Sequence, residues 1–261
     1  MSGAVVRGVA SMILEVEAAT DVGLRRAQNE DSYGEWIPAA ADERGRRGAL
    51  LVVADGMGGS RAGEVASRLA VDTVLRSYRE APGVDLLEDL LHAVEAANRT
   101  VYAESAAHPE LSGMGTTCTA VVVRGSDAYI AHVGDSRAYL VRDGAIRQLT
   151  RDHSLVAQLV RDGQLTPEQA KVDPRRNVVT RSVGVGPHVE IDGQHEAGFL
   201  QPGDTLLVCS DGLHGVVADD ELQAAASGPD LAQGCREAIA LANRRGGPDN
   251  ITVVMARVAA A

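Results

Sequence analysis

Aromatic residues are scarce in this chain of 261 residues, which holds one Phe, one Trp and five Tyr. Hydrophobic residues still make up 45% of the sequence, so the core has to consist mainly of Val, Leu, Ala and Ile. Such side chains favour helices that pack closely on sheets. One mixed domain of this length is ordinary. We expect a single domain over residues 12–261, preceded by a flexible extension at 1–11.

Lysine is nearly absent, since Lys171 stands alone against 24 arginines. A phosphate loop of the Walker type needs a lysine, and the glycine-rich segment GMGGSRAG (56–63) has none. This counts against the rival hypothesis of a nucleotide-binding protein. The 25 basic residues are outnumbered by 36 acidic ones, and the formal charge of -11 opposes polyanions and anionic membranes. We expect neither nucleic acid nor a membrane as a partner.

Cysteines are few and unpaired in spacing, at Cys118, Cys209 and Cys235. This spacing suggests neither a disulfide framework nor a thiolate zinc site, and it favours a reducing, cytoplasmic compartment. No segment reaches the roughly 20 apolar residues of a membrane span. Cys118 and Arg124 have the C-x5-R spacing of thiolate-based phosphatases, but the β-branched residues between them do not form a glycine-rich phosphate loop. We expect Cys118 in the core.

The periodicity of apolar residues predicts helices and strands in separate stretches. Repeats at three and four residues predict helices over 62–74, 87–101 and about 231–243. Alternating or continuous apolar runs predict strands near 14–18, at 204–209 and at 251–258, and an antiparallel meander over 116–149. Residues 151–187 have little strand pattern and short helix signals at 155–160 and 166–169. The arrangement favours an α+β sandwich with helices outside the sheets.

Aspartates follow three of the predicted strands, at Asp55, Asp135 and Asp211. A single Asp-Gly pair usually marks a turn or a cap. Further acids stand at strand borders in Glu30-Asp31 and at Asp249, and aligned strand ends would gather all of these carboxylates. Their repulsion would be costly unless cations neutralised it. Oxygen ligands without convergent His or Cys suit Mg²⁺ or Mn²⁺ rather than zinc.

Six ordered motifs carry a resemblance to a known family. They are RAQNED (26–31), VADGMGG (53–59), GMGTT (113–117), VGDSR (133–137), CSDGL (209–213) and GPDN (247–250). In order and spacing the chain resembles the metal-dependent Ser/Thr protein phosphatases of the PPM, or type 2C, class, over about residues 14–258. The resemblance implies a four-layer αββα sandwich, in which helix pairs flank two central antiparallel sheets, and a flap over about 151–187.

The resemblance also implies roles for single residues. Asp55 would bridge two Mn²⁺ or Mg²⁺ ions, the Gly56 carbonyl would bind one of them, and Asp211 and Asp249 would complete the first ion's ligands. Glu30 and Asp31 would hold the second ion, largely through its waters. Asp135 with Asp211 would form a weaker third site. Arg26 would clamp the phosphoryl group while a hydroxide between the ions attacks phosphorus in line, without a covalent intermediate.

One residue departs from the family pattern. Many eukaryotic relatives place His after the Asp-Gly pair as a proposed acid for the leaving alcohol, whereas this chain has Met57, which cannot donate a proton. A metal-bound water or a flap residue such as His153 remains as the donor, although for His153 we favour a role in stabilising the flap. For Arg137 we favour an ion pair that organises the acidic cluster over substrate binding. We expect Thr116 and Thr117 to serve strand packing.

The activity implied by the resemblance is hydrolysis of phosphoserine and phosphothreonine in proteins. Partners would then be phosphoprotein substrates and a bacterial Ser/Thr kinase that this enzyme opposes. We expect a free-standing cytoplasmic monomer. A non-catalytic regulatory domain of the same fold is the alternative, and loss of metal ligands would be its signature; every expected carboxylate is present.

Overall fold

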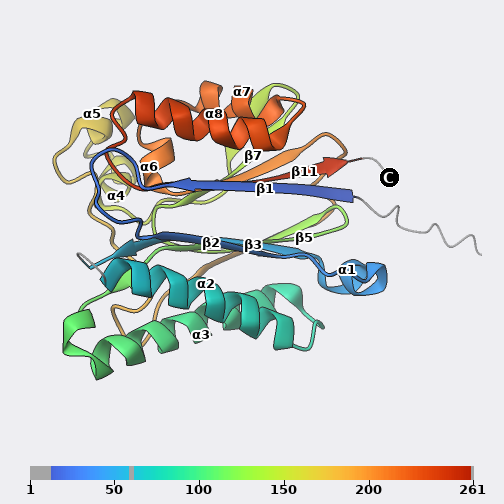
Figure 1. Cartoon of the computed structure of the whole chain (residues 1–261), viewed down its shortest axis with the longest axis horizontal. Helices are drawn as coiled ribbons and strands as arrows, with labels where there is room; N and C mark the ends of the chain where they lie inside the picture. Colours follow the sequence, from blue (N-terminus) through green and yellow to red (C-terminus); the bar gives the residue numbers. More distant parts are fainter. Residues whose placement is uncertain (1–12, 59–61, 260–261) are drawn as a thin grey trace, which may run out of the picture.

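Two β-sheets stacked face to face form the centre of the molecule, with helices on both outer sides (Figure 1). The computed structural model describes residues 13–58 and 62–259, and the extension predicted at 1–11 lies outside them. All strand pairs between named strands are antiparallel. The four-layer αββα sandwich predicted for the chain is confirmed.

The first sheet has five strands in the order β1-β11-β10-β7-β8. Their bounds are β1 Ile13–Asp21, β11 Ile251–Ala259, β10 Thr205–Cys209, β7 Arg137–Arg142 and β8 Ala145–Gln148. The last strand of the chain therefore lies between the first strand and β10. This pairing brings residues near both ends of the sequence to one edge of the sandwich.

The second sheet has the order β2-β3-β5-β6-β9, and the short β4 pairs with β3. Its strands are β2 Asp31–Trp36, β3 Ala49–Met57, β4 Gly115–Thr116, β5 Cys118–Arg124, β6 Asp127–Val133 and β9 Asp192–Glu196. Strand β3 is apolar along nearly its whole length because both of its faces are buried. Leu50 and Val52 face the outer helices, whereas Leu51 and Val53 face the other sheet.

The helices cover the outer face of each sheet. Helices α2 Ala62–Glu80 and α3 Leu86–Ala107 pack on the second sheet, and α6 Asp211–His214, α7 Asp219–Ser227 and α8 Leu231–Arg244 pack on the first. Three cores result: one under each helix layer and one between the sheets. Helix α1 Ala41–Arg47 and the short helix η1 Pro109–Leu111 complete the described helices outside the flap.

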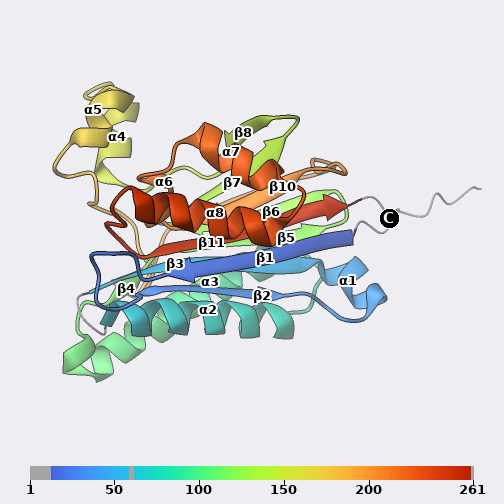
Figure 2. The same ribbon diagram turned by 45° about the horizontal axis from the view of Figure 1, so that its top comes forward.

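The flap holds α4 Leu155–Arg161 and α5 Pro167–Val172 and projects from one end of the sandwich (Figure 2). Thr166 begins α5 with the capping box that the sequence indicates, because its side chain accepts from the Gln169 backbone and Gln169 reaches back. None of the helices that the structure describes is both long enough and apolar enough to cross a bilayer.

The predicted meander over 116–149 is wrong as a single sheet. Strands β5 and β6 form a hairpin in the second sheet, and β7 and β8 form a hairpin in the first. Between them the chain crosses from one sheet to the other at Gly134–Ser136, where Gly134 has a φ of 111°. Alternation along each strand could not reveal this crossing, because both hairpins keep the same period of two.

Candidate active site

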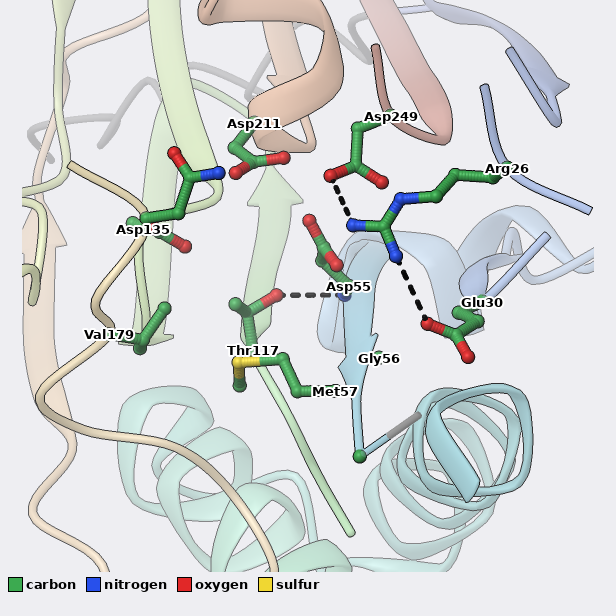
Figure 3. Close-up of a pocket in the computed structure, with 12 residues that line it drawn as sticks. Arg26, Glu30, Asp55, Gly56, Met57, Thr117, Asp135, Val179, Asp211 and Asp249 are labelled. Carbon is green, nitrogen blue, oxygen red and sulfur yellow. Dashed lines mark hydrogen bonds and ion pairs between the residues drawn. The ribbon is translucent and has the colours of Figure 1, made fainter. Parts of the chain in front are cut away.

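One cavity of about 260 Å³ opens at the end of the sandwich where the flap is attached. It is lined by every predicted site residue except Asp31: Arg26, Glu30, Asp55, Gly56, Asp135, Asp211 and Asp249. The carboxylates of Asp55, Asp135, Asp211 and Asp249 approach it from different elements (Figure 3). Residues as far apart in the chain as Arg26 and Asp249, 223 positions, therefore share one acidic site.

Asp55 lies inside strand β3 rather than in a turn after it, because the ladder continues through Gly56 and Met57 to β4. Its backbone N–H donates to the Thr117 hydroxyl (2.8 Å), and its carbonyl accepts from the Thr117 N–H (2.9 Å). A side chain on Gly56 would collide with the Gly63 carbonyl oxygen at 2.1 Å. The glycine thus permits close backbone contact between β3 and the start of α2.

Asp211 is the first residue of α6, separated from strand β10 only by the N-cap Ser210, so the second Asp-Gly pair also lies outside a β-turn. A Cβ on Gly212 would lie 1.9 Å from the Asn250 carbonyl oxygen and 3.3 Å from the Asp249 Cβ. Only glycine allows the loop of Asp249 to approach this closely. The two Asp-Gly pairs are therefore sites of close chain approach, and this contact brings Asp211 and Asp249 together.

Arg26 extends into the cavity from the loop between β1 and β2. Its guanidinium donates to Asp249 (2.7 Å) and lies 3.9 Å from Glu30, while 46% of the side chain stays exposed. Among the residues with described positions, no three acidic, His or Cys side chains share a common centre as metal ligands would. The Arg26 cation is instead the direct counterion of Asp249.

Asn250 fixes the loop that carries Arg26 and Glu30. Its side-chain amide donates to the carbonyls of Val22 and Gln28 (both 2.9 Å), and its Oδ1 accepts from the Glu30 N–H (2.8 Å). All three bonds are made by one buried side chain. Asn250 is therefore a positioning residue for this side of the cavity.

Asp31 is the predicted site residue that does not line the cavity. It is only 8% exposed, and its Oδ2 accepts from the Ser210 hydroxyl at 2.6 Å. Its other oxygen, Oδ1, is buried and has no hydrogen-bond partner among the residues that the structure describes. Burial, with the nearby charges of Asp211 and Asp249, raises the pKa of Asp31 to about 7. Its carboxylate thus lies behind the site, with one oxygen unsatisfied.

Burial and mutual repulsion raise the pKa values of three cavity carboxyl groups, those of Asp55, Asp135 and Asp211. Burial and the charge of Asp211 raise the pKa of Asp135 to about 8, and burial and Asp249 raise that of Asp211 to about 6. The pKa of Asp55 lies well above its usual range, because it is buried and faces the charges of Asp31 and Asp211. Without added positive charge, these three carboxyl groups keep their protons to a higher pH than they would in water.

The ion pair predicted for Arg137 exists, but its partner is Asp152. The guanidinium holds that carboxylate through Nε (2.9 and 3.1 Å) and Nη2 (2.7 Å). The backbone carbonyl of Asp135, at the same turn, accepts from His214 Nε2 at 2.9 Å. Arg137 therefore organises the border of the acidic cluster through a neighbouring aspartate rather than through the cavity residues.

The flap supplies part of the cavity wall through Asn177 and Val179, opposite Met57 from strand β3. His153 does not line the cavity. Its ring is buried, with Nδ1 accepting from the Gly134 N–H (3.1 Å) and Nε2 lying 3.2 Å from Asp192. These bonds favour the interpretation of His153 as a flap-stabilising residue over that of a proton donor at the cavity.

Sequence reasoning found the acidic residues of the cavity but missed the neutral residues that position them or line the cavity beside them. Thr117 was expected to serve strand packing, yet it lines the cavity and also bonds the Ser136 hydroxyl at 2.7 Å. Asn250 and Asn177 likewise escaped notice. The GMGTT and GPDN motifs contained the signal for Thr117 and Asn250, whereas Asn177 reaches the site only through the fold of the flap.

The C-x5-R spacing of Cys118 and Arg124 has no catalytic meaning here. Cys118 is fully buried in strand β5, and burial raises the pKa of its thiol to about 12. Arg124 donates to Tyr129 (2.6 Å) and Asp127 (3.3 Å) at the far end of the same strand. A thiolate nucleophile is therefore excluded at this position.

The model of the protein phosphatase 2C family matches residues 26–245 of the chain. The Mycobacterium tuberculosis serine/threonine protein phosphatase PstP is 42% identical over 95% of this chain; the match spans 46% of that longer protein, so the chain corresponds to about half of it. The Listeria monocytogenes serine/threonine phosphatase stp is 38% identical, over 93% of this chain and 95% of its own length.

A solved structure of the PstP catalytic domain in complex with two manganese ions is 40% identical and superposes with a TM-score of 0.82, covering 95% of this chain and 99% of that one. The shared fold thus extends over almost the whole molecule, including the acidic end of both sheets. From these matches and the fold, the chain belongs to the protein phosphatase 2C family.

Proposed function

We propose that this chain is a metal-dependent protein phosphatase that hydrolyses phosphoserine and phosphothreonine. The observation that carries the proposal is the acidic cavity, in which four aspartates and Glu30 surround a space beside one arginine. The relatives named above are serine/threonine phosphatases, and one of them has been solved with two manganese ions. Phosphoprotein substrates imply a Ser/Thr kinase that produces them, and a cytoplasmic location follows as part of the same proposal.

The residues present fit hard divalent cations. The donor set consists of carboxylate oxygens and the Gly56 carbonyl, the ligand types that Mg²⁺ and Mn²⁺ prefer. The orphaned Oδ1 of Asp31 and the raised pKa of Asp55 both indicate a cluster that lacks positive charge. Asp55, Gly56, Asp211 and Asp249 would hold one ion. A second would lie near Glu30 and Asp31, and a weaker third near Asp135.

When bound, such cations supply Lewis-acid activation of water and neutralise the cluster. The chain's own residues then do the remaining work. Arg26 would release Asp249 to the metal and turn its two-pronged guanidinium to the phosphoryl oxygens. Thr117 holds the backbone of Asp55, and Asn250 holds the loop of Glu30, so neither acid has to be ordered again in each catalytic cycle.

Arg26→Ala is expected to raise KM for a phosphothreonine peptide about tenfold while kcat falls less, since the variant loses an interaction with bound phosphate. Steady-state kinetics with saturating Mn²⁺ measure both constants. Arg25→Ala changes the neighbouring exposed arginine and is the matched control. An unchanged KM in Arg26→Ala would show that the guanidinium serves only as the counterion of Asp249.

The function itself is tested with the purified chain, a phosphothreonine peptide and p-nitrophenyl phosphate. We expect phosphate release with Mn²⁺ or Mg²⁺, loss of activity with a chelator, and recovery when the metal is restored. A protein that binds Mn²⁺ by calorimetry yet hydrolyses neither substrate would favour the non-catalytic regulatory domain instead. Activity that survives chelation would contradict the metal-dependent mechanism.

A further inference from the structure

The carboxylate of Asp192, the first residue of β9, contacts three side chains of the flap. They come from the two segments, here called legs, that join the flap to the sandwich. Arg151 Nη2 (3.0 Å) and His153 Nε2 (3.2 Å) come from the leg that follows β8. Arg181 Nη1 (2.9 Å) comes from the leg that returns to β9. One carboxylate at the sheet edge therefore connects both legs to the sandwich.

The orientation of His153 follows from its two bonds. Because Nδ1 accepts from the Gly134 N–H, the ring proton lies on Nε2 and is donated to Asp192. The backbone of His153 also donates to the Gly134 carbonyl (2.7 Å). His153 thus links Asp192 to Gly134, where the chain crosses between the sheets. Gly134 immediately precedes Asp135 in the sequence.

The same two legs bond to each other, and the returning leg also bonds to β4. The Leu155 N–H donates to the Val178 carbonyl (2.8 Å), and the Thr180 N–H donates to the His153 carbonyl (2.7 Å). Val183 and Thr116 exchange two backbone bonds (2.8 and 3.0 Å) further along the returning leg. Asn177 and Val179, which form the flap side of the cavity, lie within this bonded stretch.

We propose that Asp192 is a positioning residue that sets the flap wall of the cavity. By holding Arg151, His153 and Arg181 at one point, it fixes the stretch that places Asn177 and Val179 beside the metal ligands. This inference rests on the proposed function, because the flap wall matters only to a substrate that reaches it. A phosphopeptide would reach beyond the cavity along the flap, whereas a small phosphate ester would meet only the part of this wall that lines the cavity.

The test compares Asp192→Asn with Glu190→Gln. The control also removes a carboxylate from Arg181, 3.1 Å away, but Glu190 is largely exposed and contacts neither Arg151 nor His153. In Asp192→Asn we expect KM for a phosphothreonine peptide to rise about tenfold, with kcat and the hydrolysis of p-nitrophenyl phosphate changed less than about twofold. The control should behave as the unaltered protein.

Hydrogen exchange gives a readout that does not depend on activity. The amides of Leu155 and Thr180, which close the base of the flap, should exchange faster in Asp192→Asn, whereas core amides such as that of Val52 should not. Arg151→Gln removes one exposed cation and should shift the same amides in the same direction by less.

Two outcomes would overturn the proposal: flap amides that exchange as before, or equal losses for the peptide and the small ester. If the unaltered chain hydrolysed neither substrate, the proposed function would be wrong. The exchange data would then still decide whether Asp192 holds the flap.

Discussion

Asp55→Asn is expected to abolish phosphatase activity and, at the same time, to stabilise the metal-free protein. The central carboxylate is lost to the metals, so turnover should fall about 10³-fold. In the metal-free state, however, the amide has nearly the same volume and is neutral without having to take up a proton on folding, as the carboxyl group must in this self-repelling cluster. We expect a gain of about 2 kcal/mol in the free energy of unfolding.

The stability of the metal-free protein should depend on pH in the direction that this repulsion predicts. Asp55, Asp135 and Asp211 all have raised pKa values, so the folded metal-free protein keeps protons that the unfolded chain releases. Its stability therefore falls as pH rises from about 4, the ordinary range of these groups, to about 8, the pKa of Asp135. Added Mn²⁺ should reverse this loss by binding the ionised carboxylates of the folded state.

Thermal unfolding with a chelator and with Mn²⁺, at several pH values, measures these differences. Asp42→Asn removes an exposed carboxylate on α1, at the opposite end of the molecule from the flap, and is the control (Figure 1). A metal-free Asp55→Asn protein less stable than the parent would show that Asp55 is held by favourable bonds rather than against repulsion. An active variant would remove Asp55 from the proposed mechanism.

The elements with strong periodicity were predictable from the sequence, and those specified by tertiary contacts were not. Helices α2 and α3 have clear apolar faces, and β5, β6, β10 and β11 are apolar runs bounded by turn residues. In contrast, β9 carries polar and charged side chains throughout and is a strand because it pairs with β6. Helices α1 and α7 likewise escaped prediction.

The sequence predicted that the acidic residues meet in one site only because aspartates follow several predicted strands. Each Asp-Gly pair by itself resembles a turn. The structure explains why the pairs recur: Gly56 and Gly212 are points where two chain segments meet without room for a side chain. Sequence reasoning could name the acids but not their supports. The bonds from Thr117, Ser136 and Asn250 depend on register between distant strands, which no local pattern contains.

Arg47 is expected to matter for stability rather than for activity. It is a buried cation at the opposite end of the molecule from the flap. Only 7% of it is exposed. Its guanidinium donates to the carbonyls of Tyr78 and Ala81 (2.7 Å to Ala81), at the C-terminal end of α2, where partial negative charge accumulates. The faces of Trp36 and Tyr78, at 5.6 and 5.0 Å, add cation–π contacts.

The Tyr78 hydroxyl completes this arrangement by donating to the Arg47 carbonyl at 2.7 Å, so α1 and α2 are bonded in both directions. Arg47→Met preserves much of the aliphatic volume but removes the charged donor from both carbonyls, so the carbonyl of Tyr78 keeps only the Ala81 N–H, 3.3 Å away. Each hydrogen bond lost from this charged donor costs about 1.5–3 kcal/mol, and the lost aromatic contacts add to this. We expect the free energy of unfolding to fall by about 3–5 kcal/mol.

Denaturant unfolding of Arg47→Met with Mn²⁺ held constant measures that loss. Arg46→Met changes the exposed neighbour on the same helix and should lower stability by less than about 0.5 kcal/mol. The folded fraction of Arg47→Met should keep the parent's kcat, because α1 lies at the opposite end of the molecule from the flap (Figure 1), and flap residues line the cavity. Equal stability of the two variants would mean that water satisfies the end of α2 without Arg47.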